Sequence, residues 1–337
     1  MQSPNWSNGE IEQPGLEVYP LGRVDSDMRI ADQLLKSVGF VARYDPDQPL
    51  VFGGTAFIVG VKMDAQASLC HLVTAKHVAE AIEPAEAVIA MNAKDGAPRF
   101  LRTGDQQWFY HPTEKDSVDV AVLPLGSPKI DLYDFAFVPE EIFATEARIA
   151  EYNIGLGDEL ITVGLFTKFM GLTHLIPIVR TGNIAMMPSD PVPIKGFGLM
   201  EAYLAEGRSI GGLSGSPVFV RNTVKFPVQR AKSVSHLHGL GDGHLLGLAH
   251  GHWDLPASFT ATEQAEAVNM GVSIIVPARK ILEVLYHPEL TAMRKEHFEK
   301  IKKSASPTAD SALTKPFTKE NFEAALKKAS QRVTPQK

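Results

Sequence analysis

A histidine, an aspartate and a serine stand in three short segments where each could take part in proton transfer or nucleophilic attack. The first segment, residues 72–78 (LVTAKHV), reads as a strand that ends just before His77, with a helix expected over residues 77–82. A general base needs such a place, at the rim of a cleft and on a rigid support. Taken alone, His77 is better explained by a structural role, because most histidines are structural.

The second segment, residues 117–123 (SVDVAVL), places Asp119 at the start of an otherwise apolar strand. A carboxylate beside buried strand residues needs a partner, and an imidazole N–H is a suitable one. The alternative is an aspartate that only caps the entry to the strand. By itself this segment favours the capping role.

The third segment, residues 211–219 (GGLSGSPVF), is the most specific of the three. Glycines on both sides of Ser214 let the backbone turn tightly, so that the hydroxyl projects while nearby N–H groups point at one spot. The amides of Gly212 and Ser214 would then stabilise the oxyanion of a tetrahedral intermediate. A hairpin turn is the alternative, and the segment differs from the G-x-S-x-G elbow because the second glycine directly follows the serine.

Together and in this order, the three segments resemble the T-A-x-H, D-x-A-x-L and G-x-S-G-x-P motifs of the trypsin-like (chymotrypsin-fold) serine peptidases. The resemblance implies a serine endopeptidase with a catalytic triad of His77, Asp119 and Ser214 and an oxyanion hole made by Gly212 and Ser214. It also implies a protein or peptide substrate and a mechanism that needs no cofactor. Other folds that use this triad carry the three residues in other orders.

The resemblance covers about residues 50 to 287 and is nearest to the bacterial V8-like and HtrA-like branches. Lys76 and residues 216–219 (SPVF) are similar to the V8-like branch, while the segment VSIIVP over residues 272–277 suits both branches. Leu213 departs from the Asn or Asp that usually precedes the serine. No PDZ-like domain is expected after the barrels, because the remaining chain is short and charged.

Within that resemblance, the substrate pocket should be lined by residues on both sides of Ser214, namely Arg208, Ser209, Ala249, His250 and His252. Such a pocket favours an acidic side chain before the cleaved bond, as in the V8-like branch. That branch carries its histidine directly after Gly-Ile, whereas here His250 comes one place later. A shift of one residue along a strand reverses the face on which a side chain lies, so acidic preference and a solvated Arg208 remain alternatives.

Two other functions compete with peptidase activity. One is a catalytically silent, peptidase-like barrel that serves as a protein-binding module. The other is a zinc site made from closely spaced histidines, since residues i and i+2 of a strand share a face; the candidates are His236, His238, His244, His250 and His252. Turn glycines separate these histidines, and neither a metal nor another cofactor is expected. Cys70 is expected to be a buried, inert thiol.

Composition limits the partners and the compartment. The chain has 337 residues and a formal net charge of −6, so we expect neither nucleic acid nor an anionic membrane as a partner. Its single cysteine excludes an intramolecular disulfide. We see neither a secretory signal nor a stretch of about 18 apolar residues, which predicts a soluble, cytoplasmic protein. A mature form that had lost its signal would read the same.

The elements that must position the three residues read as short strands. From residue 51 onward, apolar runs rich in Val, Ile and Phe alternate with Gly, Pro, Asn and Asp. This pattern predicts an all-β barrel or sandwich. A looser segment over about residues 126–153 divides the strands into two groups, which favours two β-barrels with a linker. The resemblance implies two six-stranded antiparallel barrels followed by a C-terminal helix and a helical, charged tail.

The expected regions follow from these patterns. We expect an N-terminal lead (1–48) with a short helix near residues 30–41, a peptidase domain (49–287) made of barrel 1 (49–128), a linker (129–153) and barrel 2 (154–287), and a charged tail (288–337). Helical spacing of apolar residues predicts an amphipathic helix over residues 318–333. That helix would either dock a regulatory protein partner or lie in solvent.

Overall fold

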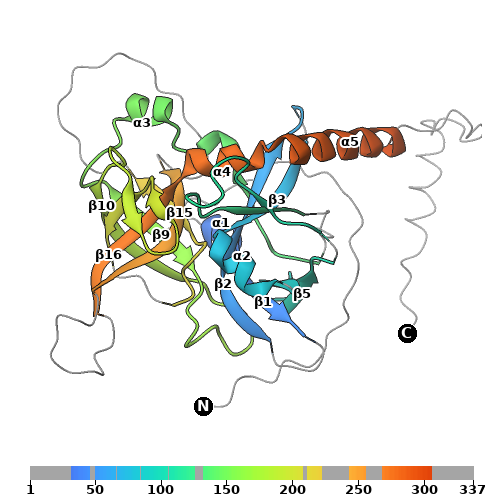
Figure 1. Cartoon of the computed structure of the whole chain (residues 1–337). Helices are drawn as coiled ribbons and strands as arrows, with labels where there is room; N and C mark the ends of the chain where they lie inside the picture. Colours follow the sequence, from blue (N-terminus) through green and yellow to red (C-terminus); the bar gives the residue numbers. More distant parts are fainter. Residues whose placement is uncertain are drawn as a thin grey trace, which may run out of the picture. The chain divides into compact units, whose positions relative to one another are not determined.

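The computed structural model describes most of the chain between residues 32 and 305, and Figure 1 shows its helices and strands. The described residues are 32–45, 50–65, 67–83, 85–104, 106–125, 132–207, 211–221, 243–255 and 268–305. Their contacts divide the chain into a unit of residues 1–295, which holds both β-sheets discussed below, and a unit of residues 296–337. Everything that follows concerns the first unit.

The first sheet contains eight strands in the order β5-β4-β1-β2-β3-β7-β6, with β8 parallel to β2. The strands are β1 (Val38–Tyr44), β2 (Val51–Lys62), β3 (Ser68–Thr74), β4 (Glu86–Asn92), β5 (Pro98–Arg102), β6 (Phe109–Tyr110), β7 (Ala121–Pro124) and β8 (Val138–Pro139). A closed six-stranded barrel was expected here. The described strands instead form an open series, because β5 and the two-residue β6 end it without a ladder between them.

The second sheet is a closed six-stranded barrel in the order β10-β13-β16-β15-β14-β9, as expected. Its strands are β9 (Glu159–Gly164), β10 (Ile178–Met186), β13 (Tyr203–Glu206), β14 (Pro217–Arg221), β15 (Gly243–Leu255) and β16 (Val268–Pro277). A small hairpin of β11 (Val192–Ile194) and β12 (Gly198–Met200) is inserted between β10 and β13. The barrel has no free sheet edge, which satisfies the backbone groups of all six strands.

The start of the described chain differs from the helix expected over residues 30–41. Helix α1 (Asp32–Lys36) is short, and β1 begins at Val38. The prediction of helix was wrong from Val38 to Val41, where apolar residues at helical spacing are also β-branched or aromatic. These residues pair with β2 and β4 and are buried on both faces of the sheet, so tertiary packing overrides the local pattern. The first sheet thus begins before residue 49.

The other helices lie in two places. The helix expected from His77 is confirmed as α2 (Lys76–Ile82), and the helical pattern after Pro277 is confirmed as α4 (Ala278–Leu285) and α5 (Pro288–Ala305). The expected linker contains η1 (Glu140–Ile142) and α3 (Glu146–Tyr152), which sequence reasoning missed. The helix expected over 318–333 lies outside the described residues. None of the described helices is long and apolar enough to cross a bilayer.

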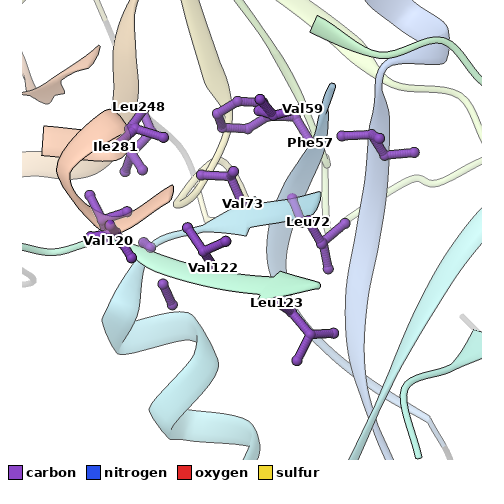
Figure 2. Close-up of a cluster of buried hydrophobic side chains, with 14 of the residues drawn as sticks. Phe57, Val59, Leu72, Val73, Val120, Val122, Leu123, Leu248 and Ile281 are labelled. Atoms are coloured by element: carbon purple, nitrogen blue, oxygen red, sulfur yellow. The ribbon is translucent and has the colours of Figure 1, made fainter. Parts of the chain in front are cut away.

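A shared hydrophobic core holds the strands that carry the candidate residues. Figure 2 shows Val73 of β3 and Val122 of β7 side by side, with Leu248 of β15 and Ile281 of α4 near Val120. All five side chains are almost completely buried. Burying an aliphatic side chain of this size contributes about 1.5–3 kcal/mol. This packing therefore fixes the approach of β7 and β15, which carry two parts of the site.

Candidate active site

The first turn of α2 holds His77 in place. Val78, Ala79 and Ile82 bury one face of this helix against the first sheet, so the helix cannot turn about its axis. The backbone N–H of His77 donates to Oδ1 of Asp119 over 2.9 Å. The helix has no side-chain cap of its own at Ala75. Asp119 therefore satisfies an N–H that would otherwise lack a helical partner.

Asp119 lies immediately before β7 and is completely buried, between the buried Val118 and Val120. Its Oδ2 is 2.8 Å from Nδ1 of His77. The two predicted residues are thus in direct contact, through the ring and through the backbone. This arrangement holds the imidazole in one orientation.

A second histidine contacts the same carboxylate. Nδ1 of His250 lies 2.5 Å from Oδ2 of Asp119. Sequence reasoning placed His250 in the substrate pocket and gave it no role at Asp119. Its position one residue beyond the histidine of the V8-like pattern gave no signal of this contact, because β15 has a register shift between Ala249 and Gly251.

The charge of Asp119 determines where the protons of both rings lie. Burial alone would raise the pKa of this carboxyl, but the hydrogen bonds from His250 and His77 outweigh burial and hold its pKa well below the usual range. Asp119 is therefore ionised and can only accept hydrogen bonds. Each Nδ1 can then donate its N–H to this carboxylate, and in the neutral tautomer of His77 that does so, Nε2 keeps a lone pair that can accept a proton.

The Ser214 loop meets the first sheet through glycines that have no room for a side chain. A Cβ on Gly215 would lie 2.2 Å from the carbonyl oxygen of Thr55 and 2.3 Å from Oγ1 of Thr74. Gly215 and Gly212 both have positive φ, at +82° and +99°. Only glycine takes such a conformation at little cost, so these two positions let the loop turn and approach β2 and β3.

Thr55 of β2 connects the two halves of the site by hydrogen bonds. Its N–H donates to the carbonyl of Ser214 over 2.9 Å, and its hydroxyl donates to the carbonyl of Gly212 over 2.8 Å. Its own carbonyl accepts from the hydroxyl of Thr74 over 2.7 Å. Sequence reasoning gave Thr55 no role, although the segment GGTA at residues 53–56 belongs to the family resemblance.

The hydroxyl of Ser214 donates to the carbonyl of His250 over 3.0 Å. Within the described part of the chain, no hydrogen bond joins it to His77. The backbone N–H groups of Gly212 and Ser214 donate to none of the described residues either. His250 therefore contacts both Asp119, through its ring, and Ser214, through its carbonyl.

Of the other pocket residues predicted from the sequence, Arg208 and Ser209 lie outside the described residues. Ala249 is buried, and its backbone pairs with the Ser214 loop: its N–H donates to the carbonyl of Ser216, and its carbonyl accepts from the N–H of Gly215. His252 lies on β15 and is half-buried. The structure brings Ala249 and His250 next to Ser214.

Two groups of described side chains have the composition of a metal site. One consists of His77, Asp119 and His250, and the other of His111, Glu114 and Glu283. In the second group both carboxylates already bind the amine of a lysine, as described below. In the first group the distances from Asp119 to the two rings are those of N–H···O hydrogen bonds.

Of the five histidines suggested as a zinc site, the structure describes His244, His250 and His252, all on β15. His236 and His238 are outside the described residues. His244 is buried on β15, and its ring lies against Tyr152 with centroids 4.3 Å apart. Cys70 is a buried free thiol, as predicted, and burial raises its pKa to about 12. A thiol with that pKa is a poor nucleophile at neutral pH.

Comparisons with known proteins add only distant likenesses. No protein-family model matches the chain, and no curated protein matches it. Among solved structures, the crystal structure of Deg5 matches with 13% identity and a TM-score of 0.43, over 74% of this chain and 88% of that one. The HtrA-type protease AlgW, solved with a decapeptide, matches with 14% identity and a TM-score of 0.42, over 76% and 65% of the two chains. The inactive form of a serine-to-alanine mutant of Rv3671c from M. tuberculosis matches with 15% identity and a TM-score of 0.40, over 79% and 96%.

Proposed function

We propose that the protein is a serine endopeptidase whose catalytic triad is His77, Asp119 and Ser214. One observation supports this above all others: the buried carboxylate of Asp119 is bonded to Nδ1 of His77, and the first sheet binds the glycine-rich loop that carries Ser214. An oriented imidazole with an open Nε2 is what activation of a serine hydroxyl requires.

The reaction we propose has two halves. Oγ of Ser214 attacks the peptide carbonyl while Nε2 of His77 takes the hydroxyl proton. The resulting oxyanion accepts hydrogen bonds from the amides of Gly212 and Ser214. His77 then gives its proton to the leaving amine, and water hydrolyses the acyl-enzyme by the same steps. Asp119 keeps the imidazole in the right tautomer and stabilises its charged form.

The proposal includes a chymotrypsin-like pairing of two barrels, with the site at their junction. The hydrogen bonds of Thr55 to the Ser214 loop support it, as does the close approach of Gly215 to β2 and β3. The residues from the first sheet supply base and carboxylate, and the barrel supplies the nucleophile. A cytoplasmic location is also part of this proposal.

A preference for acidic side chains before the cleaved bond remains a finer proposal. Nδ1 of His250 is bonded to Asp119, so only Nε2 of this ring could contact a substrate carboxylate. Acidic preference would then depend on that nitrogen together with Arg208, Ser209 and His252. A peptide library with all side chains at that position would test it, and no enrichment of Glu or Asp would exclude it.

A second candidate function is a silent barrel that binds proteins without cleaving them. The hydrogen bond from Ser214 to the carbonyl of His250 favours it, because the hydroxyl is not presented to His77 in this structure. A rotation about the Cα–Cβ bond of Ser214 would redirect the hydroxyl. Hydrogen bonds of a catalytic site are often formed only when substrate binds, so the same observation also fits a latent peptidase.

The deciding experiment is labelling with a fluorophosphonate serine probe, followed by peptide mass spectrometry. We expect an adduct on Ser214 that is absent in Ser214→Ala and strongly reduced in His77→Ala. Ser216 lies two residues away and is buried, so Ser216→Ala serves as the matched control and should still be labelled. If the native protein is not labelled and does not cleave peptides, the silent binding module is the better description.

A further inference from the structure

Asp119 carries an unusual set of partners for a buried carboxylate. Oδ1 accepts the backbone N–H of His77, and Oδ2 accepts ring N–H groups from both His77 and His250 over 2.8 and 2.5 Å. The two rings lie edge to face, with centroids 5.3 Å apart and planes at 74°. The proposed mechanism uses one of these rings and leaves the other without a role.

We propose that His250 is a positioning residue, which holds Asp119 by a second imidazole hydrogen bond and, through it, orients His77. The inference rests on the proposed peptidase function and adds a component to its site. The side chain of His250 touches neither the substrate carbonyl nor the leaving amine in this scheme.

The need for a second donor follows from the surroundings of Asp119. Its side chain has 0% exposure and lies between apolar strand residues. A buried charge is costly unless several hydrogen bonds compensate it. Since Oδ2 has more than one lone pair, a single ring N–H leaves acceptor capacity open. The N–H of His250 fills that capacity and fixes the carboxylate plane in which Nδ1 of His77 is bound.

The position of His250 also gives this bond a structural meaning. Asp119 precedes β7 of the first sheet, while His250 lies on β15 of the closed barrel. The hydrogen bond between them therefore joins the two sheets at the catalytic carboxylate. Since the carbonyl of His250 accepts the hydroxyl of Ser214, one residue contacts the carboxylate and the nucleophile together.

Phe197 fixes the ring of His250 from the other side. It stands in the turn between β11 and β12, and its ring meets that of His250 at 5.2 Å and 86° and that of His77 at 6.5 Å and 77°. Such edge-to-face contacts restrict the rotation of both imidazoles. The charged groups that face the pair are the carboxylate of Asp119 and, across the Phe197 ring, the amine of Lys76 at 5.9 Å from that ring.

This role predicts that replacing His250 shifts the pH profile of kcat/KM in a defined direction and also lowers the rate. Without the N–H of His250, the negative charge of Asp119 interacts more strongly with His77. The imidazolium of His77 is then stabilised relative to its neutral ring. The acid side of the kcat/KM profile should therefore move to higher pH when His250 loses its donor. A residue that only supports the fold would lower activity without moving this profile.

The test compares His250→Leu, which removes the donor, with His250→Asn, which keeps an N–H close to the position of Nδ1. We expect kcat/KM of His250→Leu to fall about 10- to 100-fold, mainly in kcat, with the acid limb at higher pH. His250→Asn should recover most of the loss and restore the profile. His174→Asn changes an exposed histidine in the loop between β9 and β10 and is the matched control.

Folding is checked by circular dichroism and thermal unfolding. If His250→Leu does not fold, His250→Gln takes its place, because the longer side chain keeps polarity but moves the donor away from the Nδ1 position. Equal kcat/KM and equal pH profiles in His250→Asn and the donor-displacing variant would overturn the inference.

A measurement without turnover separates this inference from the proposed function. In ¹⁵N-histidine-labelled Ser214→Ala protein, NMR should show two strongly hydrogen-bonded Nδ1–H groups, one lost in His77→Ala and the other in His250→Asn. Two such groups in a protein that the serine probe does not label would support the shared carboxylate and overturn only peptidase function. A single group, from His77, in a protein that cleaves peptides would overturn only the role of His250.

Discussion

Two clusters of histidine and carboxylate lie among the described residues, and they differ in what surrounds the carboxylates. In the first, Asp119 is completely buried and its described side-chain partners are the two rings of His77 and His250. In the second, Glu283 accepts from Nε2 of His111 over 2.6 Å and also binds the amine of Lys280 over 3.0 Å. Among the described residues, the first carboxylate is bonded by two imidazoles and one backbone N–H, whereas the second is neutralised by a lysine.

The histidines of the two clusters, His77 and His111, differ in exposure and in how many ring nitrogens are hydrogen-bonded. Nδ1 of His111 accepts the backbone N–H of Glu114 over 2.9 Å, and its Nε2 is bonded to Glu283, so both ring nitrogens are occupied. The side chain of His111 is 3% exposed, while that of His77 is 37% exposed. His77 bonds Asp119 through Nδ1, and its Nε2 makes no hydrogen bond with the described residues. A carboxylate next to a histidine thus marks a reactive site only when a ring nitrogen remains open.

The largest expected difference between the clusters is in turnover. Asp119→Asn should lower kcat/KM by about 10³- to 10⁴-fold, because an amide NH₂ cannot accept from both rings and no longer stabilises the imidazolium. Glu283→Gln should change kcat/KM by less than about twofold. Steady-state kinetics on one fluorogenic peptide measures both variants. A loss of similar size in Glu283→Gln would remove the distinction drawn between the two clusters.

The second difference should be seen in stability. Lys280→Met removes an amine that bonds Glu114 at 2.9 Å and Glu283 at 3.0 Å, from a side chain only 6% exposed. We expect unfolding to become easier by about 1–3 kcal/mol, with kcat/KM close to native. Urea unfolding and peptide kinetics on the same preparation provide the two numbers. A variant of native stability would mean that the second cluster contributes nothing measurable to the fold.

A fourth histidine, His71, sharpens the comparison through the pH dependence of stability. It is buried beside Arg294, and burial together with that charge lowers its pKa from 6.5 to about 3. Below pH 6.5, His71 therefore binds a proton in the unfolded chain but not in the folded protein. The free energy of unfolding falls as pH decreases from about 6.5 towards 3. Between pH 6.5 and 5 the slope should approach about 1.4 kcal/mol per pH unit.

His71→Asn keeps a side-chain N–H for the carbonyl of Leu69, which Nδ1 of His71 contacts at 3.1 Å, and has no group that titrates in this range. Urea unfolding at several pH values should show a shallower slope for this variant. Parallel slopes would show that His71 takes up its proton in the folded protein as well.

The sequence predicts best what depends on short segments. The strand ending before His77, the closed barrel that carries Ser214 and the helix after Pro277 all follow from local apolar patterns and turn residues. The prediction of a helix is wrong at residues 38–41. The spacing of their apolar side chains suits a helix, but pairing with two neighbouring strands makes them part of β1.

Contacts between distant segments are what the sequence could not supply. Phe197 comes from a hairpin 120 residues beyond His77, and the bond from His250 to Asp119 spans 131 residues. Neither has a local signature, since an aromatic residue in a turn and a histidine on a strand are common. Thr55 lay in a recognised segment, but its hydrogen bonds to the Ser214 loop depend on how the two sheets dock.

The hydrogen bonds of Thr55 also have a consequence for synthesis of the chain. During translation, the segment with His77 and Asp119 leaves the ribosome well before the segment with Ser214, and neither half alone contains all three groups. The turn of the Ser214 loop packs against Thr55 and Thr74, which belong to the segment that is synthesised first. If the protein is the peptidase proposed above, it can cleave other chains only after both sheets have folded and docked, so the folding time sets a minimum delay before activity.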